Sequence, residues 1–487
     1  MTFEETLAEW MPTQRWFAGK GARILDLAIV ADTELVTGDP GLRHLIIDVS
    51  QGSSVDSYQV FAGFREHIPD RLEHAVIGEA SGAGQAGPAA GETHPASAGK
   101  TSPATAGKTH RATAGKTSPA APAAGLTAYD ALHDPELTRF LLAAMAAGDQ
   151  AGPLRFAREP GASIETGLDS LVLTGEQSNT SLMFAETSIL KVFRRLSPGP
   201  NPDLEVPRAL AGLGSPHVAE PLGWIETRMD GAPTVLGILS RYLRAASDGW
   251  SLAATSVRDL YANDGMRAAD AGGDLAGEAH RLGVATAEVH RDLAEAFGTD
   301  ELPADAANDL ARQMFHRLDV ALAAVPQLGR HADLIGSAFS DLAKLGQPLL
   351  VQRVHGDYHL GQVMRTQTGW VVLDFEGEPA TPLAQRRARS PALRDVAGML
   401  RSFDYAARHQ LRSHSDQERV HQAAREWVRR NQAAFCSGYA EAGGMDPGRH
   451  TTLLRALVLD KAVYEVMYEA RNRPDWLSIP LGSIADS

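Results

Sequence analysis

Runs of apolar, β-type residues occupy three stretches near the N-terminus, residues 24–36, 44–51 and 54–64. The turn sequences GDPG and QGSS separate these stretches. Apolar runs bounded by such turns predict strands of an antiparallel sheet. Before them, residues 4–11 have the composition of a short helix that ends at Pro12.

A second strand-rich stretch, residues 168–196, contains three apolar runs separated by two turns. The sequence predicts three further strands there, then a helix that begins near Asp203. Another apolar run, within residues 234–250, is interpreted as the last strand of this unit and its connection to the next unit.

The rest of the chain has mainly the helical pattern. Apolar residues recur at spacings of three and four over residues 277–297 and 306–325, which indicates amphipathic helices of a large second lobe. The same spacing marks a helix around Leu137 and Leu141. The order of the elements therefore predicts an α+β protein with β structure first and helices afterwards.

Residues 81–125 fit neither pattern. They are mostly Ala, Gly, Pro, Ser and Thr, and an eight-residue unit repeats as SAGKTSPA, TAGKTHRA and TAGKTSPA over residues 97–120. Each unit contains GKT, but the upstream glycine and the strand and helix of a phosphate-binding loop are missing. So few large apolar residues cannot offset the entropy of ordering, and the sequence predicts a disordered insert.

Composition narrows the class of protein. A chain of 487 residues with 44% hydrophobic residues predicts two or three domains or lobes. Its net charge of −14 argues against nucleic-acid and anionic-membrane partners. The single cysteine, Cys436, excludes an internal disulfide. The N-terminus is acidic and no apolar run has membrane-spanning length, so we expect a cytoplasmic protein.

Candidate chemistry is concentrated in one stretch, Val351–Pro379. An apolar approach leads to a loop with Asp357 and Gln362, and a second apolar run leads to Asp374 and Glu376. Moving a γ-phosphoryl group needs one carboxylate at the acceptor hydroxyl, and a second carboxylate with an amide oxygen for metal ions. Asp357 suits the first role, and the other three residues suit binding of Mg²⁺.

A structural alternative exists for each of these carboxylates, because Asp357 could cap a turn and Asp374 could end a strand. The combination of HGD, an amide five residues later and a strand ending in DFE favours the phosphoryl-transfer site.

The sequences HGDYHLGQ and DFEGEP, followed by SPALRDVAGMLRSFDYAA, closely resemble those of the bacterial maltokinases, within the aminoglycoside-phosphotransferase-like kinases. The resemblance implies a bilobal, protein-kinase-like fold with an N-terminal antiparallel β cap and a mostly helical C-terminal lobe. We therefore expect a cap over residues 1–80, the insert over 81–125, an intermediate subdomain and nucleotide lobe over 126–243, and the helical lobe over 244–487.

Lys191 lies within the apolar strand sequence ILKVF and needs a partner there. In kinase folds, two ATP phosphates and a glutamate on a helix are the partners of this lysine. Glu205 is the first candidate for that glutamate, with Glu220 or solvent as alternatives. By resemblance, ATP would also contact the loop and connection residues Ser178, Asn179, Thr180, Ser240, Tyr242 and Leu243.

The acceptor sugar is expected near His359 and near a helix in residues 459–477. Lys461, Tyr464, Glu465 and Tyr468 recur there at helical spacing, so they share one face. Aromatic faces beside charged groups are typical of sugar sites. A solvent-exposed, ion-paired helix is the alternative interpretation.

The resemblance implies an ATP- and Mg²⁺-dependent maltokinase. Such an enzyme forms maltose 1-phosphate for α-glucan synthesis, often together with trehalose synthase. Two alternatives stay open: a kinase for another sugar or amino sugar such as glucosamine, and a catalytically silent protein with a kinase fold. The joint presence of Lys191, Asp357, Gln362 and Asp374 argues against the silent protein.

Overall fold

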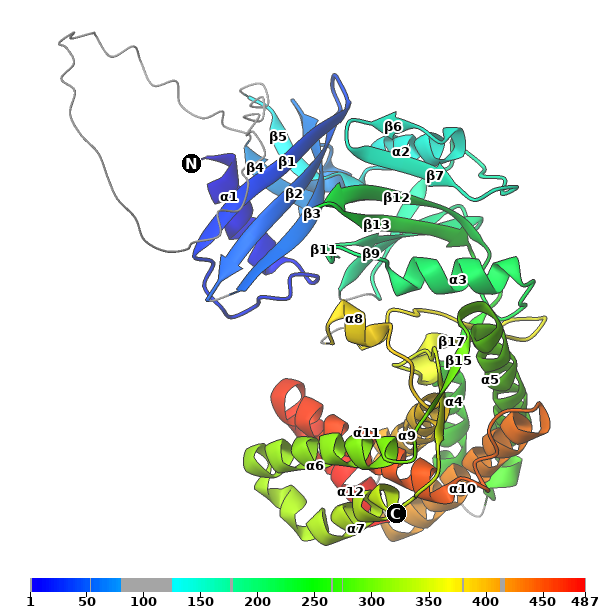
Figure 1. The fold of residues 1–487 in the computed structure, drawn as a ribbon. Helices are drawn as coiled ribbons and strands as arrows, with labels where there is room; N and C mark the ends of the chain where they lie inside the picture. Colours follow the sequence, from blue (N-terminus) through cyan, green and yellow to red (C-terminus); the bar gives the residue numbers. More distant parts are fainter. Residues whose placement is uncertain are drawn as a thin grey trace, which may run out of the picture.

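The computed structural model describes residues 2–52, 54–79, 125–175, 178–263, 266–273, 275–378, 381–411 and 417–486. Figure 1 shows a β cap beside a second β unit, with a helical lobe below both. The predicted order of β structure followed by helices is confirmed. The predicted disordered insert lies outside the described residues.

The cap is an antiparallel sheet with one helix on it. Helix α1 begins after a capping box, in which Thr2 and Glu5 bond each other's backbone N–H groups. Its buried residues Phe3, Leu7 and Trp10 pack on the sheet. The sheet order is β1-β2-β3-β5-β4, and β11 also pairs with β3. The cap elements are α1 (Phe3–Trp10), η1 (Met11–Thr13), β1 (Asp26–Val36), β2 (Gly41–Gln51), β3 (Ser54–Arg65), η2 (Asp70–Ala75), β4 (Val76–Glu79), β5 (Thr127–Asp130) and η3 (Ala131–His133).

Strand β3 joins the cap to the second β unit, because its side chains alternate between two cores. Tyr58 and Val60 belong to the core under α1, whereas Phe61 belongs to the core of the second unit. The buried amide of Gln59 donates to the carbonyl oxygens of Phe193 and Leu236, both at 2.6 Å. The cap is therefore packed against the second unit rather than tethered to it.

The ends of the insert meet in this sheet. Glu79 at the end of β4 pairs with Thr127 at the start of β5. The two described residues that flank the segment are therefore neighbours, and we expect the pairing of β4 with β5 to depend little on the length of the segment between them.

Deleting residues 97–120, which removes the three repeats, should therefore leave the melting temperature and the turnover nearly unchanged. Thermal unfolding and steady-state kinetics of the shortened protein test this. Deleting β4 (Val76–Glu79) is the matched control and should lower the melting temperature, because β5 then loses one of its two partner strands. A comparable loss in the first variant would contradict the prediction.

The second β unit is a seven-stranded antiparallel sheet of order β6-β7-β12-β13-β10-β9-β8. Helix α3 lies along its lower edge, next to the helical lobe (Figure 1). The elements of the second unit are α2 (Pro135–Ala147), β6 (Gln150–Ala151), β7 (Leu154–Arg158), β8 (Ser170–Leu173), β9 (Asn179–Phe184), β10 (Ser188–Phe193), α3 (Pro202–Gly212), β12 (Pro221–Met229) and β13 (Ala232–Arg241). Strand β11 (Arg195–Leu196) follows β10 in the chain and joins the cap sheet.

The helical lobe surrounds one large apolar core, to which α4, α5, α9, α10 and α11 all contribute. None of its described helices combines the length and apolar character needed to cross a membrane. Its elements are β14 (Ser247–Asp248), α4 (Gly249–Ala262), η4 (Ala268–Gly273), α5 (Leu275–Phe297), β15 (Thr299–Leu302), α6 (Ala306–Ala324), η5 (Pro326–His331), α7 (Ala332–Ala343), β16 (Leu349–Gln352), η6 (Leu360–Gln362), β17 (Val363–Arg365), β18 (Trp370–Val372), α8 (Leu383–Arg386), α9 (Leu393–His409), α10 (Gln417–Glu441), α11 (Thr451–Asn472), η8 (Pro474–Trp476) and α12 (Ser478–Ala485).

Candidate active site

The loop that carries Asp357 is held from below by α9. Buried Asp395 accepts hydrogen bonds from the backbone N–H groups of His355 (2.7 Å) and Gly356 (2.9 Å), and His290 Nε2 lies 3.0 Å from the same carboxylate. The helix comes so close that a Cβ at Gly398 would lie 2.5 Å from the carbonyl oxygen of Tyr358. Asp395 therefore positions the loop.

Asp374 follows strand β18 and has a left-handed backbone, with φ of 58°. Asp tolerates this region better than most residues, and such a conformation is common at functional sites. The turn directs its two carboxylate oxygens to different partners: Oδ1 lies 2.7 Å from Lys191 Nζ and Oδ2 lies 3.0 Å from Gln362 Nε2. The hairpin thus brings Gln362 and Asp374 together, as predicted from their spacing.

Lys191 joins the two lobes through three carboxylates. Its ammonium lies 2.9 Å from Asp203, 2.7 Å from Asp374 and 2.7 Å from Glu376. Burial alone would lower the pKa of Lys191, but these charges raise it well above its ordinary value. Lys191 is therefore a fixed cation at the interface of the lobes.

The predicted partner of Lys191 is wrong. Glu205 lies 2.7 Å from Arg387 and 3.2 Å from Arg353, whereas Asp203 bonds the lysine. Two residues correspond to about 200° of helical rotation, so the two acids in the first turn of α3 face in different directions. Glu220, the alternative, pairs with Arg241. The N-cap at Asn201 marks where the helix begins, but not which side faces the lysine.

These contacts predict different effects for two similar variants. Asp203→Asn should lower kcat/KM for ATP roughly 10- to 100-fold, the effect of losing a charge-assisted hydrogen bond. Glu205→Gln is the matched control in the same helical turn and should lower it by less than about threefold, since its contacts resemble those of an ordinary ion pair. The measurement is steady-state kinetics with varied ATP. A larger loss of kcat/KM in Glu205→Gln than in Asp203→Asn would reject Asp203 as the partner of Lys191.

A cavity of about 440 Å³ lies between the two lobes beside Lys191. Apolar side chains from both lobes line it, including Ile189 and Ile238 above and Val372 below, and Ser178 and Asn179 lie at its polar end. This combination suits a flat apolar base next to a charged phosphate group.

Two predictions about this cavity need correction. Thr180 does not line it, because adjacent strand residues point to opposite faces; its buried hydroxyl accepts from Arg194 Nε at 2.8 Å, and Ser181 lines the cavity instead. Of the three connection residues, Ser240 lines the cavity, but Tyr242 and Leu243 do not. The N–H of Tyr242 donates to the carbonyl oxygen of Thr187 at 3.1 Å, so it is not free for a base.

The carboxylates around Lys191 fit a divalent cation. Asp203, Asp374 and Glu376 offer oxygen atoms within 4.8 Å of one another, and these three carboxylates, set against Lys191 and against Arg386 at 3.9 Å from Glu376, leave one surplus negative charge. Burial, together with the neighbouring carboxylates, raises the pKa of Asp203 to about 6. Mg²⁺ prefers carboxylate and amide oxygens, so Asp374, Glu376 and the amide of Gln362 could hold it.

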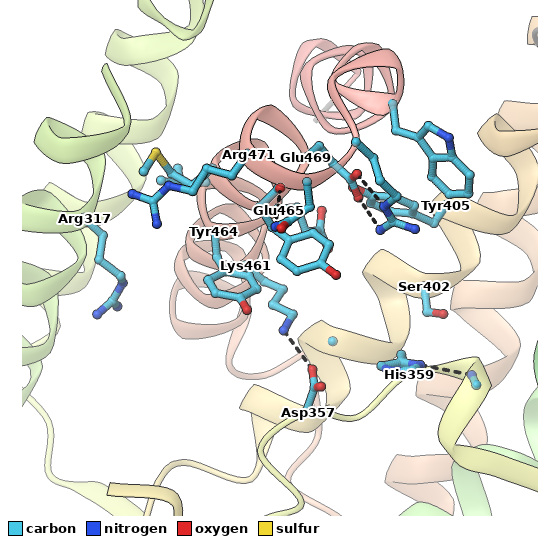
Figure 2. Close-up of a pocket in the computed structure, with 18 of the residues that line it drawn as sticks. Arg317, Asp357, His359, Ser402, Tyr405, Lys461, Tyr464, Glu465, Glu469 and Arg471 are labelled. Carbon is cyan, nitrogen blue, oxygen red and sulfur yellow. Dashed lines mark hydrogen bonds and ion pairs between the residues drawn. The ribbon is translucent and has the colours of Figure 1, made fainter. Parts of the chain in front are cut away.

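A second and larger cavity, of about 1160 Å³, lies within the helical lobe above Asp357. Figure 2 shows Lys461, Tyr464 and Glu465 projecting into it from α11, with Asp357 and His359 below and Ser402 and Tyr405 to one side. The five predicted acceptor residues, His359, Lys461, Tyr464, Glu465 and Tyr468, all line this cavity. The shared helix face inferred from their spacing thus faces a cavity, and contact with a sugar stays a prediction.

Lys461 connects this helix face to the candidate base. Its ammonium lies 3.2 Å from Asp357 and 2.8 Å from Glu378, and it lies over the ring of Tyr464. Burial would raise the pKa of Asp357, but the charges of Lys461 and His359 lower it below its ordinary value. Asp357 is therefore ionised at neutral pH and can accept a proton.

The other carboxylates of this cavity are also paired with cations. Glu465 lies 2.5 Å from buried Arg401, and Glu469 lies 2.7 Å from Arg473. No local signal marks Arg401, because it comes from α9, whereas the spacing of four residues between Glu469 and Arg473 could have indicated their pairing. Other lining residues that no sequence signal marks include Trp250, Arg317, Ser402, Tyr405, His409 and Trp476.

The two cavities meet at the catalytic loop. Gly361 lines both of them, with Asp357 on the side of the larger cavity and Asp374 on the side of the smaller one. A group transferred from one cavity to the other would pass between these two carboxylates.

Comparisons with known proteins agree with this architecture. Residues 10–90 match the maltokinase N-terminal cap domain family. A glucosamine kinase of Streptacidiphilus jiangxiensis is 32% identical over 347 residues, which cover 67% of this chain and 74% of that protein.

Two solved structures are also similar. A glucosamine kinase in complex with glucosamine, ADP and inorganic phosphate aligns at 27% identity with a TM-score of 0.60, covering 72% of this chain and 85% of that one. A glucosamine kinase described as crystal form B covers 100% of this chain and 99% of its own, with a TM-score of 0.65 at 23% identity, and supports the fold alone.

Proposed function

The chain belongs to the maltokinase-like kinases with an aminoglycoside-phosphotransferase-like fold, the family that also contains the glucosamine kinases to which it is similar, and on this premise we propose that it phosphorylates maltose. It is a sugar kinase. In the proposed reaction, the γ-phosphoryl group of ATP passes to the anomeric hydroxyl and gives maltose 1-phosphate. The role of the product in α-glucan synthesis, a partnership with trehalose synthase and a cytoplasmic location belong to the same proposal.

The observation that carries the proposal is the junction of the two cavities at Gly361. ATP would lie between the lobes with its phosphates near Lys191 and Asn179. The sugar would lie above Asp357 with its anomeric hydroxyl toward the junction. Two separate cavities that open onto one catalytic loop suit direct transfer between bound substrates.

The residues divide the chemical work. Asp357, ionised beside Lys461, would orient the anomeric hydroxyl and accept its proton as the new O–P bond forms. Lys191 would hold the phosphates of ATP, and Asp203 would hold Lys191 in place. Mg²⁺ at Asp374, Glu376 and Gln362 would supply charge neutralisation of the phosphates when bound.

Charge in the acceptor cavity favours a neutral sugar. Among the described residues that line it, Asp357, Glu465 and Glu469 are the carboxylates, and each already contacts a lysine or an arginine. The ammonium of an amino sugar would find no unpaired carboxylate there and would be repelled by Lys461 and Arg473. A volume of about 1160 Å³ also leaves ample space for a disaccharide.

Glucosamine is the second candidate, because the two similar proteins from bacteria are named glucosamine kinases. A coupled assay of ADP release with maltose, glucosamine, glucose and trehalose at equal concentrations separates the candidates. We expect the largest kcat/KM for maltose. A larger value for glucosamine would reject maltose as the substrate and leave the kinase assignment intact.

Tyr464 offers a test of the acceptor site itself. Tyr464→Ala should raise the KM for maltose about tenfold and the KM for ATP by less than about twofold, because of the two substrates only the sugar would contact the ring. Tyr464→Phe keeps the aromatic face and is the matched control, with a much smaller effect. Equal effects on the two KM values would mean that this face of α11 does not contact the acceptor.

A further inference from the structure

The acceptor cavity continues beyond the residues discussed so far. In its wall, two tryptophans and a histidine from three different elements form a cluster: Trp250 of α4, His409 of α9 and Trp476 of η8. The ring centres of Trp250 and His409 are 5.9 Å apart, and those of His409 and Trp476 are 4.6 Å apart. We call these three residues the aromatic shelf.

The shelf faces the cavity, although Trp250 also packs against the apolar core of the helical lobe. All three residues line the cavity and are only partly buried. Large aromatic side chains that keep part of their surface in a cavity provide apolar area that a ligand can cover.

A row of rings connects the shelf to Asp357. Tyr464 and Tyr468 lie stacked on α11 with ring centres 6.4 Å apart. The guanidinium of Arg473 then lies between Tyr468 and Trp476, at 5.3 Å and 4.3 Å from their ring centres. Glu469 holds this guanidinium with two hydrogen bonds of 2.9 and 2.7 Å. Aromatic faces therefore continue from the catalytic end to the shelf, with charged hydrogen-bonding groups beside them.

The helix provides a measure of the length of this row. One helical turn rises about 5.4 Å, close to the span of one glucosyl unit. Lys461 contacts Asp357, and Asn472, which also lines the cavity, lies about three turns further along α11. A disaccharide with its reducing end at Asp357 would not reach Trp476, which follows the end of α11, whereas a longer linear glucan would.

Resting on the proposed function, we propose that the aromatic shelf is a distal subsite for the non-reducing end of linear α-glucan oligosaccharides. The enzyme then phosphorylates maltotriose and maltotetraose at the anomeric hydroxyl as well as maltose. The additional unit stacks on Trp476 and Trp250, and Arg473 and Glu469 donate to and accept from its hydroxyl groups.

The test is a chain-length series of kcat/KM with maltose, maltotriose and maltotetraose. For the unaltered protein we expect the KM for maltotetraose to be about 3- to 10-fold below that for maltose, the effect of one added aromatic contact. In W476A the KM for maltotetraose should equal the KM for maltose. In W476F, which keeps an aromatic face, most of the difference between the two KM values should remain. W250A provides a second variant from a different element, in case W476A does not fold.

The outcomes separate the two proposals. If maltose is a good substrate but longer glucans are no better, or if W476A and W250A lower kcat/KM equally for every chain length, the shelf is not a subsite. If glucosamine is phosphorylated and no malto-oligosaccharide is, the proposed function fails and the subsite fails with it.

Discussion

Replacing Asp374 with alanine should lower kcat by about 10³-fold or more, with the protein still folded. A metal ion stabilises transferring charge by several kcal/mol, and each 1.4 kcal/mol changes the rate about tenfold. The structure identifies the reason for choosing this residue: Asp374 lies between Lys191 and Gln362, so its loss removes contacts with both lobes of the site.

Rates measured over a range of Mg²⁺ concentrations, with the melting temperature as the check on folding, provide the measurement. Asp374→Asn is the matched control for size, and it should also be strongly impaired because it lacks the charge. A variant that keeps its activity with an unchanged Mg²⁺ dependence would show that Asp374 only ends a strand.

Replacing Asp357 with asparagine should lower kcat by roughly 10²–10⁴-fold, the range for loss of a positioned base. Asparagine keeps the shape of the side chain, and the partner of Asp357, Lys461, retains Glu378 at 2.8 Å. The fold and the KM for both substrates should therefore change little.

Calorimetric binding of ADP to Asp357→Asn tests whether the nucleotide cavity is intact in this variant. Comparison with Tyr464→Ala, which should act mainly on the KM for the sugar, distinguishes a residue of the reaction from a residue of binding. Unchanged turnover in folded Asp357→Asn would reject Asp357 as the base.

The hairpin chemistry was predictable because its residues are close in sequence. Gln362 precedes β17 and Asp374 follows β18, so both lie at the open end of the hairpin. The pairing of the two strands brings their side chains to 3.0 Å. The face of α11 was predictable for a similar reason, since helical periodicity alone puts Lys461, Tyr464 and Tyr468 on one side. In both cases one local element determines which side chains lie together.

The wrong predictions for Glu205 and Thr180 have one cause. Each depended on how one element is oriented relative to another, which the sequence does not show. Asp203 and Glu205 are equally good candidates until the rotation of α3 against β10 is known. Thr180 and Ser181 differ only in the face of β9 that they occupy, and packing of the sheet decides which face meets the cavity.

The sequence by itself determined the order of the elements, the hairpin carboxylates and the existence of an aromatic, charged helix face, because these depend on contacts within a few residues. Only the tertiary structure decided that Lys461 pairs with Asp357, 104 residues away, that Arg401 holds Glu465, and that Trp250, His409 and Trp476 meet. Such pairings depend on how rigid elements pack around a common core, and that packing is selected by the total apolar burial of many residues rather than by any local pattern.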